Sequence, residues 1–139
     1  MASVCLSCVS KKDLSAVIIT DNGKLVTKRV ERIKDEEVAC STYLSLIVAF
    51  TVGLNMLKMY VEEHQDIDEV VFECNNSAFI KWVNQGYSRD EYHNEFSKML
   101  ELLNDIPIRY SFSYNRKPKS LMFTDEKYIV REKLGGLLD

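Results

Sequence analysis

The feature that most constrains the fold is the stretch 68–86, where a short apolar run leads through a polar turn into a helical pattern. Residues 70–72 are β-branched or aromatic, which indicates a buried strand. Residues 75–77 can end that strand and cap a helix. Apolar residues then recur at helical spacing over 78–83, and Gly86 stands where a helix would stop. The stretch predicts a strand–turn–helix unit with polar side chains at the carboxyl end of a strand, where open α/β sheets commonly bind ligands.

The run from Asn76 to Gly86 resembles the fourth-strand motif of ribonuclease H-like proteins, in which an Asp-Ser-x-Tyr/Phe turn leads into a helix that carries a Trp. Ser77, Phe79 and Trp82 match that motif. The family's Asp, a ligand of catalytic magnesium, falls on Asn76. The resemblance therefore implies an amide where the family has a carboxylate.

The remaining patterns predict an α/β protein, with strands expected at 3–9, 14–20, 25–33 and 107–114 and helices at 41–63, 88–104 and 124–134. Asn22-Gly23 favours a type I′ hairpin turn, and the scattered bases of 25–33 favour an edge strand. The sequence from Ser88 to Glu91 is typical of a capping box. This order over residues 1–139, taken as a single domain, is similar to the ribonuclease H-like fold. That fold implies a mixed five-stranded sheet of order 3-2-1-4-5 flanked by helices.

The apolar stretch 38–57 contains no charged residue and would be long enough to span a bilayer. Its polar residues dilute the hydrophobicity, and no aromatic-and-basic pattern marks two membrane interfaces. We therefore expect a helix capped by Ser41 or Thr42, buried along the sheet and continuing to Glu63, and no membrane contact.

The resemblance also implies a metal-dependent active site, because the family holds two magnesium ions with acidic oxygens. The family's first Asp falls on Cys8, and its helix Glu falls on Tyr43, or on Thr42 with a one-residue shift. Asn76 takes the second Asp position, and only the final Asp has a counterpart, Asp125. Neutral side chains cannot balance the charge of hard divalent cations. We therefore expect no catalytic residues, no metal and no cofactor.

Two other readings of the acidic residues and of Asn76 stay open at this point. Asp13, Asp21 and Glu73 could form a rearranged nuclease site, although Asp21 belongs to a turn at the opposite end of the hairpin. Asn76 could simply cap the helix that follows it.

The four cysteines are Cys5, Cys8, Cys40 and Cys74. Cys5 and Cys8 have the spacing of a zinc or redox pair, but on a strand this spacing points the side chains to opposite faces. No second pair completes a metal site, and no secretory leader pattern precedes them. Reduced, buried thiols in a cytoplasmic protein are expected.

The charge distribution separates the candidate functions. Residues 61–106 carry 3 bases and 11 acids, whereas residues 107–139 carry 7 bases and 4 acids. We expect an inactive ribonuclease H-like protein that binds a protein partner. The alternatives are a noncanonical nuclease and a non-catalytic nucleic-acid binder, whose candidate contacts are Arg116, Lys117 and Lys119, with Trp82 or Tyr87 stacking on bases.

Overall fold

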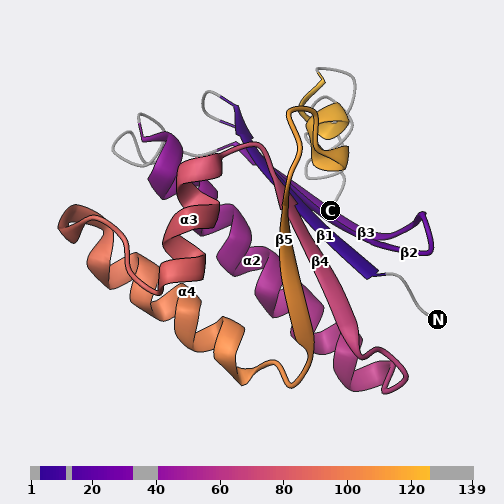
Figure 1. Cartoon of the computed structure of the whole chain (residues 1–139). Helices are drawn as coiled ribbons and strands as arrows, with labels where there is room; N and C mark the ends of the chain where they lie inside the picture. Colours follow the sequence, from indigo (N-terminus) through magenta and orange to yellow (C-terminus); the bar gives the residue numbers. More distant parts are fainter. Residues whose placement is uncertain (1–3, 12–13, 33–40, 126–139) are drawn as a thin grey trace.

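The computed structural model describes residues 4–11, 14–32 and 41–125. Its strands form one sheet of order β3-β2-β1-β4-β5 (Figure 1). The strands are β1 (Val4–Lys11), β2 (Leu14–Asp21), β3 (Lys24–Arg32), β4 (Glu69–Cys74) and β5 (Arg109–Tyr114). β1 is antiparallel to β2 and parallel to β4, and β5 is parallel to β4. The predicted α/β class and strand order are confirmed.

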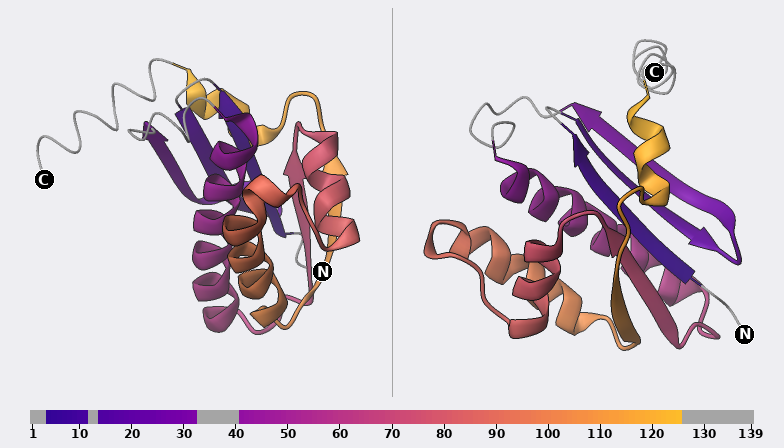
Figure 2. Two further views of the ribbon diagram at one scale, coloured as in Figure 1. Left: turned by 90° about the vertical axis from the view of Figure 1, so that its left-hand side faces the viewer. Right: turned by 45° about the horizontal axis from the view of Figure 1, so that its top comes forward.

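The three described α-helices pack on one face of this sheet, and a short 3-10 helix lies on the other (Figure 2). They are α2 (Thr42–Glu63), α3 (Ser77–Gln85) and α4 (His93–Asp105), with two short 3-10 helices, η1 (Asp90–Tyr92) and η2 (Lys119–Thr124). Side chains alternate along a strand, so Leu6 and Cys8 of β1 join the main core beneath α2, whereas Val9 packs with Phe123 of η2 on the other face.

Local signals placed several of these elements as expected. Asn22 and Gly23 have φ values of 53° and 82°, which confirms the left-handed turn between β2 and the edge strand β3. Ser41 caps α2 by accepting the backbone N–H of Leu44 at 3.2 Å, and the helix ends at Glu63 as predicted.

Two local predictions differ from the structure. The capping box is wrong, because the Ser88 hydroxyl donates to the carbonyl of Arg89 instead of accepting a backbone N–H, and α4 begins later, without a side-chain cap. The sequence patterns did not predict the 3-10 helix η2 at residues 119–124. The helix predicted from 124 to 134 falls, apart from its first two residues, outside the described part of the chain.

α2 is the one helix among the described residues that is long and apolar enough to cross a bilayer. Its inner face packs on β1 and β2 through buried residues that include Phe50 and Leu54, as expected for a core helix. Only 44% of its most apolar stretch is buried, however, so its outer face remains largely uncovered. That this helix stays out of a membrane remains a prediction.

Gly53 marks the closest approach of α2 to the sheet. A Cβ atom there would lie 2.7 Å from Val17 Cγ2 and 3.1 Å from Leu6 Cδ1. Gly53→Val should therefore lower the free energy of unfolding by about 2 kcal/mol, despite the poor helix propensity of glycine. Urea unfolding measures the change. Asn55→Val, on the exposed side of the same helix, should shift it by less than about 0.5 kcal/mol, and equal losses in both variants would contradict the account.

Candidate functional site

The carboxyl ends of β1 and β4 carry two thiols side by side. The parallel register pairs Ser7 with Glu73, so that Cys8 and Cys74 follow on neighbouring strands. Cys8 is 0% exposed and Cys74 is 1% exposed, and both belong to the main core. Burial raises the pKa of the Cys8 thiol, and the neighbouring Cys74 raises it further. Neutral, enclosed thiols are poor ligands for hard divalent cations.

Asn76 is a helix cap. Its Oδ1 accepts the backbone N–H of Phe79 at 2.9 Å and its side chain thereby begins α3. Gly86 ends the same helix with a φ of 86°. The structure therefore bears out the capping role for Asn76, and its amide oxygen is already occupied by a backbone donor.

Asn76→Ala should lower the free energy of unfolding by about 1 kcal/mol, because the N–H of Phe79 loses its acceptor. Asn76→Asp should leave stability close to that of the wild type, since a carboxylate caps equally well and favours a helix N-terminus. Asn75→Ala is the matched control, because the Asn75 side chain is exposed. Thermal unfolding of the three variants tests this; a loss from Asn75→Ala as large as that from Asn76→Ala would count against it.

Tyr43 lies in an aromatic cluster at the start of α2. Its ring centroid is 4.7 Å from that of Trp82 and 5.8 Å from that of Tyr92, and Arg89 lies over its ring. Trp82 is 8% exposed and also contacts Phe96. Trp82 is therefore a core residue, which contradicts the suggestion that it stacks on bases.

Asp125, the only acid at the four positions implied by the family resemblance, directly follows η2. Its backbone N–H donates to the carbonyl of Met122 at 3.2 Å, and its side chain is exposed. The structure thus shows a buried thiol, a packed phenol, an amide used as a cap and one carboxylate at the four positions. This donor set does not fit a pair of divalent cations.

Glu73 anchors a polar network that the sequence did not reveal. Its side chain is 8% exposed and faces η2. Oε1 accepts from the Ser7 hydroxyl at 2.9 Å and from the Lys119 N–H at 2.6 Å, and Oε2 accepts from Asn115 Nδ2 at 3.2 Å. The Ser7 hydroxyl in turn accepts the Ser120 N–H at 3.0 Å. An acid next to the apolar run of a buried strand was the available signal, because a buried charge needs partners.

The structure keeps the acids of the suggested rearranged site apart. Asp21 Oδ2 accepts the Tyr60 hydroxyl at 2.6 Å, a hydrogen bond that raises the pKa of Tyr60 to about 12. Asp21 thus contacts α2 on one face of the sheet, whereas Glu73 contacts residues 115–120 on the other. Asp13 lies outside the described residues. Over the described ranges, no three His, Cys, Asp or Glu side chains are grouped as a metal site.

The basic loop candidates lie at the same edge of the sheet as Cys8 and Asn76. Arg116, Lys117 and Lys119 follow β5, which runs parallel to β1 and β4, and their side chains are exposed. Tyr87 is 65% exposed, but it follows the C-terminal end of α3, whereas Asn76 lies at the N-terminal end of that helix. The structure therefore brings the three bases together without an adjacent Tyr87.

Neither a protein-family model nor a curated protein matches the chain. Among solved structures it is similar to LC11-RNase H1, isolated from compost by a metagenomic approach, with a TM-score of 0.63 and 15% identity over 96% of this chain and 93% of that one. The same protein in complex with an RNA/DNA hybrid matches with a TM-score of 0.63 and 13% identity, over 84% and 88%.

The N-terminal RNase H domain of a Mycobacterium tuberculosis protein has a TM-score of 0.65 and 7% identity, over 98% of this chain and 99% of that one. These similarities, together with the strand order, show that the chain has a ribonuclease H-like α/β fold. At such low identity they show the fold alone.

Proposed function

We propose that this chain is a catalytically inactive ribonuclease H-like protein that acts by binding a protein partner. The observation that carries the proposal is the state of Cys8: at the position of the family's first Asp, a neutral thiol is enclosed in the apolar core. Asn76 and Tyr43 are likewise committed to capping and packing. Asp125 alone cannot supply the negative oxygens that two divalent cations require.

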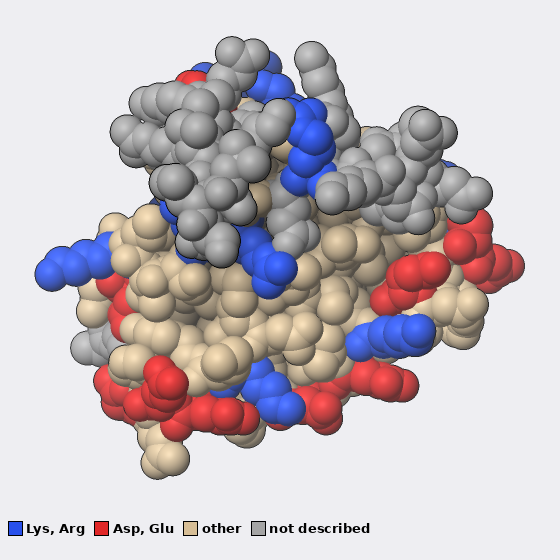
Figure 3. All heavy atoms as spheres, turned by 180° about the vertical axis from the view of Figure 1, so that it is seen from behind, with Lys and Arg blue, Asp and Glu red and all other residues tan. Residues whose placement is uncertain are grey.

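Two uncovered apolar surfaces support a protein partner. From behind, the molecule presents an uncharged area bordered by acidic and basic side chains, and α2, which has no charge over residues 42–57, lies on this side (Figure 3). A groove of about 220 Å³ between α2 and α4 is lined by the apolar side chains of Ile47, Val48 and Val52, together with Thr51, Glu95 and Lys98. On β5, Tyr110 and Tyr114 are 41% and 56% exposed. Uncovered apolar and aromatic surface of this kind marks interaction sites.

An affinity capture from cell extract tests the proposal, with the tagged full chain and with and without nuclease treatment. We expect a polypeptide that is retained after digestion and at raised salt, since apolar contacts depend weakly on ionic strength. Val52→Lys, in the groove between α2 and α4, is the test variant, and Lys81→Ala, at an exposed position of α3, is its control. Retention that disappears with nuclease would contradict the proposal.

A second candidate is a non-catalytic nucleic-acid binder. It is supported by the cluster of Arg116, Lys117 and Lys119 at the carboxyl edge of the sheet, and by the similarity to LC11-RNase H1, whose structure with an RNA/DNA hybrid is known. Fluorescence polarisation with a labelled hybrid distinguishes it. Binding that falls steeply with salt and is lost when the three bases become alanine would favour this candidate, whereas Lys81→Ala should leave binding unchanged.

A further inference from the structure

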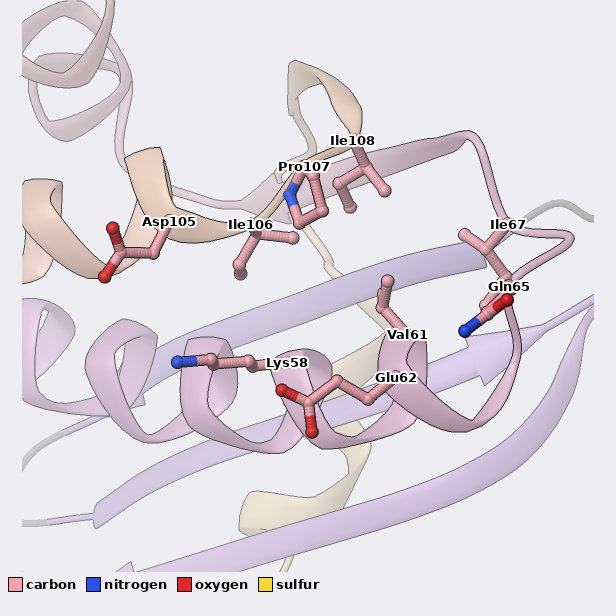
Figure 4. A pocket seen from close by; sticks show the side chains of 9 residues that line it. All are labelled: Lys58, Val61, Glu62, Gln65, Ile67, Asp105, Ile106, Pro107 and Ile108. Carbon is pink, nitrogen blue, oxygen red and sulfur yellow. The ribbon is translucent and has the colours of Figure 1, made fainter.

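A second cavity, larger than the groove between α2 and α4, lies at the other end of the sheet from Cys8 and Asn76 (Figure 4). It has a volume of about 460 Å³ and is lined by the last turns of α2 and α4 and the segments that lead into β4 and β5. This volume is within the range of ligand-binding pockets. The cavity is remote from every position that the family resemblance singles out.

The cavity has an apolar floor and a charged rim. Val61, Ile67 and Ile106 form the floor and are 9%, 5% and 5% exposed. Glu62 projects from α2 and Asp105 from the end of α4, and both side chains are exposed at the rim. An aliphatic chain could therefore lie on the floor while a polar head stays at the rim.

The rim is negative for two independent reasons. First, Lys58 is the only base in the lining, so that one positive and two negative side chains leave a net charge of −1. Second, two helices end here, and the free carbonyls of a helix C-terminus carry partial negative charge.

Helices commonly offset this charge with a base in the last turn, but neither α2 nor α4 has one. The surroundings are also acidic, because residues 62–69 contain five acids and no Lys or Arg. Within the described residues, the side chains of Glu62 and Asp105 make no hydrogen bond or ion pair. A cationic group from outside would therefore find uncommitted carboxylates.

We propose that this cavity receives a lysine or arginine side chain from a basic, partly apolar segment of the protein partner. The aliphatic stem packs on Ile67 and Ile106, and the charged head lies between Glu62 and Asp105. The proposal rests on the protein-binding function above and specifies the chemistry of the partner: a segment with bases flanked by apolar residues, which the acidic character of residues 62–69 attracts.

Three fluorescein-labelled synthetic peptides test the proposal: one of Lys and Leu, one of Glu and Leu, and one of Lys and Ser. We expect the full chain to bind the Lys–Leu peptide most tightly. The double variant Glu62→Gln/Asp105→Asn should weaken that binding by about tenfold. Asp90→Asn/Glu91→Gln, which removes the same charge from η1 at the other end of α4, should change it by less than about twofold.

Backbone amide chemical shifts provide a readout that does not depend on the variants, and the Lys–Leu peptide should perturb residues 58–67 and 105–108. Equal weakening by both double variants, or shifts centred elsewhere, would overturn the cavity assignment. A nuclease-resistant partner that binds the Glu62→Gln/Asp105→Asn variant as tightly as wild type would also overturn it, while leaving the protein-binding function intact. If no partner survives nuclease treatment, the protein-binding function fails instead, and the peptide measurements separately test what the cavity itself binds.

Discussion

Replacing Cys8 by aspartate is expected to lower the free energy of unfolding by about 3–5 kcal/mol, because it places a carboxylate in the core without a partner. Cys8 is 0% exposed and lies beneath α2. Its neighbour on the adjacent strand β4 is Cys74, whose thiol offers no compensating charge. In a ribonuclease H-like enzyme a metal ion would balance a carboxylate at this position. Here the groups that act electrostatically on this position are the Cys74 and Cys5 thiols and the Glu73 carboxylate, none of which carries a positive charge.

Urea unfolding of Cys8→Asp, with and without excess magnesium chloride, measures the effect. Cys8→Ser is the matched control for size, and it should cost clearly less because a hydroxyl carries no charge. Magnesium should leave the stability of Cys8→Asp unchanged. A recovery of stability specific to Cys8→Asp in magnesium would mean that the family's positions still converge on a metal site.

Replacing Glu73 by alanine is expected to lower the free energy of unfolding by about 3 kcal/mol, because three donors lose their shared acceptor in a largely buried setting. The loss should be concentrated where the network acts. Glu73 joins β4 to Ser7 on β1 and to the backbone of Lys119, so that its removal should weaken the attachment of the segment 115–124 to the sheet.

Limited proteolysis provides the local readout, and cleavage within 115–124 should accelerate more than cleavage elsewhere. Glu69→Ala, at the exposed start of the same strand, is the control and should change stability by less than about 0.5 kcal/mol. If Glu73→Ala unfolds like the wild type, the network contributes no stability and the description of Glu73 as an anchor is wrong.

The parts of the fold that the sequence predicted depend on short-range effects. Asn22 and Gly23 accept positive φ, Asn76 bonds an N–H three residues ahead, and Gly86 adopts the left-handed conformation that ends α3. Each signal acts within a few residues, so the chain order alone reveals it. Alternation along β5 likewise placed Phe112 against the core.

The parts that the sequence did not predict depend on contacts between distant residues. The partners of Glu73 lie 42 to 66 residues away, so its role follows only from the strand register and from the packing of η2. The capping box predicted at Ser88 did not form, although its sequence pattern is local. The Ser88 hydroxyl instead donates to the carbonyl of the next residue, Arg89. The cavity beside Glu62 and Asp105 also arises only when two helix ends meet.

The most direct test of the inactive-enzyme account is hydrolysis of a fluorescently labelled RNA–DNA hybrid by the full chain in magnesium or manganese, alongside the Asp125→Asn variant. We expect neither protein to release product above the buffer control, because three of the four positions offer no carboxylate. Time-dependent cleavage by the wild type that is abolished by Asp125→Asn would contradict the account.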